Sequence, residues 1–71
     1  MIRFLRYSME HQRKIRAVML LDGRLAQRTV LVLSYTDTDV TLLIGQQKKP
    51  VTLPAADILS CDYARGDHGE E

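Results

Sequence analysis

Every second residue from 15 to 21 is apolar, with the period of two that is typical of a β-strand, while the other face carries Lys14, Arg16, Val18 and Leu20. The apolar face of this segment carries Ile15, Ala17, Met19 and Leu21. Residues 25–35 contain a run that is apolar on both faces, Thr29-Val30-Leu31-Val32-Leu33, which predicts a central or sharply bent strand. Shorter apolar segments at 38–44, 51–53 and 58–63 predict three more strands.

Turn signals separate these segments. Asp22-Gly23 predicts a two-residue hairpin, because glycine tolerates the positive φ of such a turn. Residues 36–39 (Thr-Asp-Thr-Asp) predict a turn whose Asp side chains bond nearby backbone N–H groups, and the polar residues 45–50 predict another. Residues 54–57 (Pro-Ala-Ala-Asp) suit one turn of 3₁₀ helix. Strands spaced by roughly 8–12 residues predict a small all-β sandwich or barrel.

Residues 1–12 fit two interpretations. As a strand they place Ile2 and Phe4 on one face, and as a helix they align Met1, Leu5 and Met9 at i, i+4 spacing. The aromatic and β-branched content favours the strand. Residues 67–71 are polar, with nothing to bury, so we predict a single folded domain over 1–66 followed by a frayed tail.

Length and composition limit the class of protein. Seventy-one residues form one small domain, with a stability of about a few kcal/mol. The single cysteine, Cys61, excludes an internal disulfide framework and a Cys-based zinc cluster. No apolar run approaches the roughly 18 residues of a membrane span, and Arg3 and Arg6 interrupt any signal-peptide core. We therefore expect a cytoplasmic protein without a membrane partner.

Charge is distributed unevenly around a net value of +1. Residues 1–28 hold seven basic and two acidic residues (+5), whereas residues 29–71 hold three basic and seven acidic ones (−4). Such asymmetry marks a nucleic-acid-binding face in some proteins. The asymmetry is equally explained if basic residues of the early strands lie beside acidic residues of the later strands, within one chain or across a dimer interface. We favour the second interpretation, because a dedicated nucleic-acid binder usually keeps its excess of positive charge.

The order of these segments resembles a small SH3-like or Sm-like barrel of five or six strands. The resemblance rests on the strand and turn at 15–23, the bent strand to Tyr35, the strand at 40–44, and the short Val51-Thr52-Leu53 strand with its Pro54 turn before Ile58. The resemblance extends over most of residues 13–63, and it concerns the order of strands and turns rather than a specific sequence motif. It implies a barrel that binds a partner, the Sm-like RNA-binding proteins being the most similar family.

The residues that hold uracil in Sm-like proteins are not matched. Those proteins place an Asp-x-x-x-Asn element after the first hairpin, where this chain has Leu-Ala-Gln-Arg-Thr at 25–29. An Arg65-Gly66 pair is present, but no apolar strand follows it. A weaker resemblance to the WYL ligand-sensing domains rests on Ile2-x-Phe4-x-x-Tyr7 and Asp57-Ile58-Leu59, while the Trp-Tyr-Leu element is missing. Neither resemblance implies a site residue.

Catalytic and metal-binding patterns are weak. His11 and His68 lie at opposite ends of the chain, with no other ligand at metal spacing, so we expect no metal and no cofactor. Cys61 has no histidine nearby in the sequence and is interpreted as a buried structural cysteine. Asp37 and Asp39 are interpreted as turn residues. With no nucleophile–base pair, we expect no enzyme.

Two functions fit these observations. The favoured one is a non-enzymatic binding or assembly module that self-associates as a homo-oligomer or binds an unidentified protein, because the 29–44 segment is apolar on both faces and barrel edges invite strand pairing. The alternative is RNA or single-stranded nucleic-acid binding through a basic N-terminal face with a tyrosine for base stacking. Its candidate residues are Arg13, Lys14, Arg16, Lys48, Lys49 and Tyr35.

Overall fold

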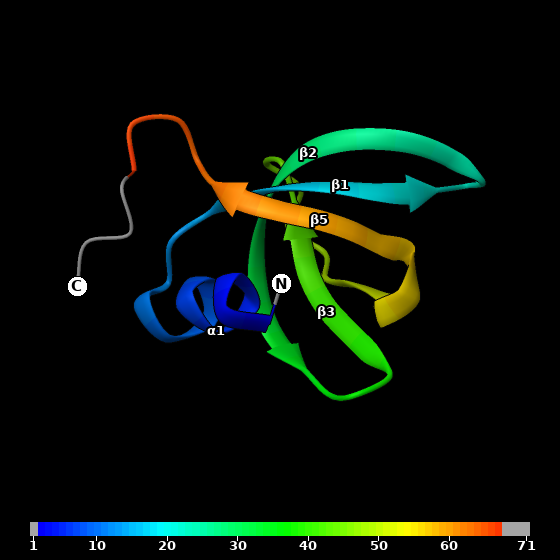
Figure 1. Ribbon diagram of the computed structural model, residues 1–71, viewed down its shortest axis with the longest axis horizontal. Helices are drawn as coiled ribbons and strands as arrows, with labels where there is room; N and C mark the ends of the chain where they lie inside the picture. Colours follow the sequence, from blue (N-terminus) through cyan, green and yellow to red (C-terminus); the bar gives the residue numbers. More distant parts are fainter. Residues whose placement is uncertain (1, 68–71) are drawn as a thin grey trace.

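The computed structural model describes residues 2–67, which form one helix and a single five-stranded antiparallel sheet (Figure 1). Along the chain the elements are α1 (Ile2–His11), β1 (Ile15–Leu21), β2 (Arg24–Tyr35), β3 (Asp39–Ile44), β4 (Val51–Pro54), the 3₁₀ helix η1 (Ala55–Asp57) and β5 (Ile58–Tyr63). The strands are ordered β4-β3-β2-β1-β5, so β4 and β5 form the two edges. The prediction of a mostly β-sheet domain with five strand segments is confirmed.

The N-terminal segment is a helix, so the favoured strand interpretation is wrong. Leu5 and Ser8 are buried one turn apart on the same side of α1, and the helix packs against β2 and β5. The helix ends at His11; the next residue, Gln12, has a left-handed φ of 54°, and the Arg13 N–H donates to the Ser8 carbonyl at 3.2 Å. This is a Schellman-type termination. Contacts made by the helix with the sheet outweigh the strand preference of its aromatic residues.

The Asp22-Gly23 hairpin is present as predicted. The two residues have φ values of 53° and 78°, as a type I′ turn requires, and Leu21 pairs with Arg24 directly across the turn. The 36–39 turn is also present, but its side-chain bonds differ from the prediction. Thr36 Oγ1, rather than an aspartate, accepts the N–H groups of Thr38 and Asp39 at 3.2 and 3.0 Å. The Thr36 hydroxyl, which precedes these N–H groups by two or three residues, accepts them in the way that an Asp or Asn side chain does in an Asx turn.

Strand β2 joins the two halves of the sheet. Its residues up to Val30 pair with β1, and its residues from Val30 onward pair with β3. The register shifts between Val32 and Ser34 on the β3 side, an irregularity that increases local twist. Strand β2 is the central strand of the sheet, as predicted, but the apolar run fully buries only one face, because Val30 and Val32 are buried while Leu33 is exposed.

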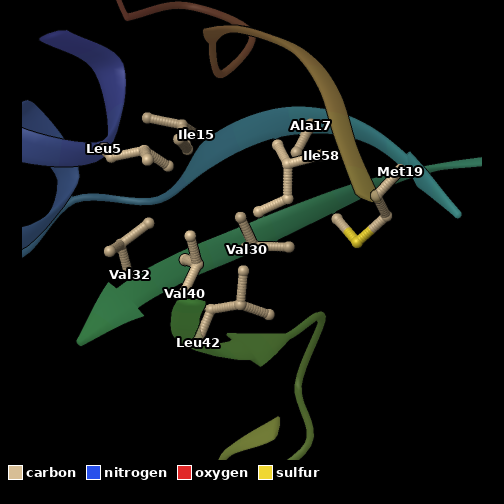
Figure 2. Packing of buried hydrophobic residues seen from close by; sticks show 9 residues of the cluster. All are labelled: Leu5, Ile15, Ala17, Met19, Val30, Val32, Val40, Leu42 and Ile58. Atoms are coloured by element: carbon tan, nitrogen blue, oxygen red, sulfur yellow. The ribbon is translucent and has the colours of Figure 1, made fainter. Parts of the chain in front are cut away.

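One cluster of buried apolar side chains fills the concave side of the sheet (Figure 2). The helix contributes a single residue to it and β1 contributes three, with the others coming from β2, β3 and β5. The members are Leu5, Ile15, Ala17, Met19, Val30, Val32, Val40, Leu42 and Ile58. The predicted inward face of β1 is thus confirmed for Ile15, Ala17 and Met19, and Leu21 packs against the cluster while remaining partly exposed.

Candidate functional site

Two of the predicted basic residues are paired with acidic residues from the other end of the chain. Strands β1 and β5 are neighbours, with Arg16 opposite Asp62, and the Arg16 Nη2 lies 3.5 Å from the Asp62 Oδ2. The Arg16 Nε also donates to the Tyr63 carbonyl at 3.0 Å. The Arg13 Nη1 lies 3.6 Å from the Asp67 Oδ1. Internal compensation, the favoured interpretation of the charge asymmetry, therefore holds for Arg13 and Arg16.

The lysines of the predicted nucleic-acid face lie around the turn after β3. The Lys14 Nζ donates to the Gly45 carbonyl at 3.4 Å, and the Gly45 N–H donates to the Thr29 carbonyl at 2.7 Å. The turn that begins there carries Lys48 and Lys49, both exposed. None of the three lysines forms an ion pair within residues 2–67. We call Lys14, Lys48 and Lys49 the lysine group.

Arg28 is a basic residue near this turn that the sequence analysis missed. It precedes Thr29, the partner of Gly45, and is exposed. Its proximity depends on the pairing of β2 with the turn after β3, for which the local sequence carries no signal. Tyr35, by contrast, lies six residues beyond Thr29, roughly 20 Å along an extended strand, and packs partly buried against the core. The structure does not bring it to the lysine group.

Asp67 connects the C-terminal segment to the helix. The Tyr7 hydroxyl donates to the Asp67 carboxylate, at 2.9 Å from Oδ1 and 2.8 Å from Oδ2, and Arg13 approaches the same carboxylate. Desolvation raises the pKa of Tyr7, and the hydrogen bond to Asp67 raises it further. The Asp67 side chain is only 12% exposed, although the sequence analysis placed it in the frayed tail. The rest of that tail, 68–71, lies outside the described residues.

A groove runs along the exposed side of α1 beside the end of β5, and we call it the α1–β5 groove. Its volume is about 440 Å³. Tyr63 stacks edge-to-face on Tyr7 and Phe4, with ring centroids 5.2 and 4.9 Å apart, and the His11 ring lies 4.9 Å from Tyr7. The lining residues are Ile2, Arg3, Arg6, Tyr7, Glu10, His11 and Tyr63. Sequence analysis missed this groove because it exists only when residues 2–11 are helical.

Cys61 lies beside a smaller hollow of about 210 Å³ on β1 and β5. It is opposite Ala17 in the sheet and packs against the core. Burial raises the pKa of the Cys61 thiol, which keeps it protonated and unreactive near neutral pH. Cys61 is partly rather than fully buried, so the prediction of a buried cysteine holds only in part.

Between residues 2 and 67 there is no group of three or more His, Cys, Asp and Glu side chains that could hold a metal ion. His68 lies outside that range. No helix in the described part of the chain is long and apolar enough to cross a membrane.

No family model, curated protein or solved structure matches the chain. The geometry of the sheet edges, the lysine group and the α1–β5 groove is therefore the basis for the function proposed below.

Proposed function

We propose that this protein is a non-catalytic assembly module that binds further copies of itself through the two free edges of its sheet. The observation that carries this proposal is the strand order, in which β4 and β5 each have a strand neighbour on one side only within residues 2–67 (Figure 1). The free edge of a strand presents unpaired N–H and C=O groups to a second strand. Leu59 adds an apolar side chain, 47% exposed, to the β5 edge.

Charge complementarity favours pairing of β4 from one copy with β5 from the next. If the two strands run antiparallel, the start of β4 lies beside the end of β5. Lys48 and Lys49, which precede β4, then approach Asp62 of the neighbouring copy. Asp62 is 67% exposed even though it pairs with Arg16, so it is accessible to a second cation. Such a head-to-tail contact repeats from copy to copy and closes into a ring if the rotation allows.

The finer fold assignment, an SH3-like or Sm-like barrel, is part of the proposal. Strand β2 has 12 residues and serves two neighbours, which supports a strongly curved sheet. Register shifts in β1–β5 and in β2–β3 support curvature at two further points. A 3₁₀ turn between β4 and β5 brings the last two strands to opposite edges of the same sheet.

Substituting Leu59 with lysine tests the assembly proposal. We expect the wild-type chain to elute at a mass that is a multiple of 8.1 kDa, and Leu59→Lys to move towards the monomer, because a charge on a strand edge opposes pairing. Size-exclusion chromatography with light scattering, over a range of protein concentrations, measures this mass. Ile2→Lys is the matched control, because Ile2 is an apolar side chain that is 55% exposed and belongs to α1 rather than to a strand of the sheet. A wild-type monomer at every concentration, or equal effects of the two substitutions, contradicts the proposal.

A second candidate function, single-stranded nucleic-acid binding, is favoured by the contact of Lys14 with the turn that carries Lys48 and Lys49. We expect the triple variant Lys14→Gln/Lys48→Gln/Lys49→Gln to bind labelled RNA more weakly. The slope of log affinity against log salt should fall by about 2, from about 0.7 per lost phosphate contact. Fluorescence anisotropy at several salt concentrations measures the slope, with Arg24→Gln as the control. An unchanged slope in the triple variant rejects this function.

A further inference from the structure

Two arginines, Arg3 and Arg6, line the α1–β5 groove. Arg3 and Arg6 are one helical turn apart, and neither forms an ion pair within residues 2–67. The Arg3 guanidinium lies 4.9 Å above the Phe4 ring, which orients it without neutralising its charge. Arg13 and Arg16, by contrast, are each paired with an aspartate. The positive charge of the groove is therefore available to an anion from outside.

Tyr7, His11 and Tyr63 supply aromatic rings to the groove, beside Ile2 and Glu10. Tyr63 is held between Phe4 and Tyr7 by two edge-to-face contacts, and Tyr7 is held in addition by its bond to Asp67. His11 is exposed beside Tyr7 at the C-terminal end of α1. Rings fixed in this way lose little entropy when a planar ligand stacks on them.

We infer that the α1–β5 groove binds a nucleotide, with its phosphate on Arg3 and Arg6 and its base against the rings of Tyr63 and His11. Guanidinium groups match phosphate oxygens in charge and geometry, and tyrosine and histidine stack on bases of any sequence. Glu10 supplies an acceptor in the same groove for a ribose hydroxyl or a base amino group. The volume of about 440 Å³ falls within the range of small-ligand sites.

This inference goes beyond the proposed assembly. Six of the seven lining residues belong to α1, and the seventh, Tyr63, is the last residue of β5, a strand that the proposed contact between copies also uses. The lysine group is also a different surface from the α1–β5 groove, because it lies around the turn after β3. A free nucleotide and a nucleotide unit within a single strand share the phosphate and the base, and the experiment below distinguishes these two sources.

Titration of the ¹⁵N-labelled protein with adenosine monophosphate, followed by amide chemical shifts, is the direct test. We expect saturable shifts confined to residues 3–11 and residue 63. Adenosine, which has the ring without the phosphate, and inorganic phosphate, which has the charge without the ring, should each bind at least about tenfold more weakly. A short single-stranded RNA that binds more tightly than adenosine monophosphate at the same amides identifies a strand as the source. Equal affinities identify the free nucleotide.

Two matched variants complete the test. We expect Arg3→Gln/Arg6→Gln to weaken adenosine monophosphate binding about tenfold, because it removes both phosphate partners. Lys48→Gln/Lys49→Gln removes the same charge from the lysine group and should change the affinity less than twofold. Equal losses in the two variants, shifts spread over all basic residues, or phosphate binding as tight as the nucleotide overturns the inference. The oligomeric mass of Arg3→Gln/Arg6→Gln should equal that of the wild type, so assembly and nucleotide binding succeed or fail separately.

Discussion

Replacing Leu42 with alanine is expected to lower the free energy of unfolding by about 2–5 kcal/mol, because it removes apolar surface and leaves a cavity. Leu42 is fully buried on β3 and faces the cluster in which β1, β2 and α1 meet (Figure 2). A domain of this size has a total stability of about a few kcal/mol, so the variant should be largely unfolded at 25 °C. Urea unfolding followed by circular dichroism measures the difference.

Leu25→Ala is the matched control for this substitution. It makes the same chemical change at a side chain that is 67% exposed, and its effect should stay within about 0.5 kcal/mol. Both variants are compared with the wild type at one protein concentration, because self-association makes apparent stability depend on concentration. A Leu42→Ala variant as stable as Leu25→Ala would mean that the core is not where the structure places it.

The strands could be predicted because their signals are local. Alternation along β1 and the Asp22-Gly23 turn specify a strand face and a hairpin within a few neighbouring residues. The helix could not be predicted in the same way. A ten-residue helix is marginal by itself in water, and α1 is stabilised by contacts with β2, among them the bond between Ser8 and Val32, which are 24 residues apart in the sequence. Aromatic residues that favour strands in general here serve to pack α1 against Tyr63.

The candidate sites show the same division between local and distant information. The charge asymmetry of the sequence indicated that basic early strands lie beside acidic later ones, and the pairing of Arg16 with Asp62 confirms this. The β1–β5 register decides which arginine lies beside an acidic residue. It brings together Arg16 and Asp62, which are 46 positions apart in the sequence. Arg3 and Arg6 form no ion pair within residues 2–67, although Glu10 lines the same groove.

Ser8 is the polar residue on which the position of α1 depends most. Its side chain is fully buried, its Oγ donates to the Arg13 carbonyl at 2.6 Å, and the same Oγ accepts the Val32 N–H at 3.0 Å. One hydroxyl thus joins the helix, the connection to β1 and the middle of β2. The Val32 N–H lies next to the register shift in β2–β3.

We expect Ser8→Ala to lower the free energy of unfolding by about 2–4 kcal/mol, because a buried donor and a buried acceptor each lose their partner. Urea unfolding gives the total, and Ser34→Ala, which removes an exposed hydroxyl from the same sheet, should cost less than about 0.5 kcal/mol. Hydrogen exchange separates this cause from a general loss of packing. The Val32 amide should lose protection in Ser8→Ala by more than the other β2 amides, whereas in a partly unfolded Leu42→Ala variant all of them should lose protection together. Unchanged protection at Val32 would show that Ser8 does not hold the helix to the sheet, and the α1–β5 groove would then lack its main support.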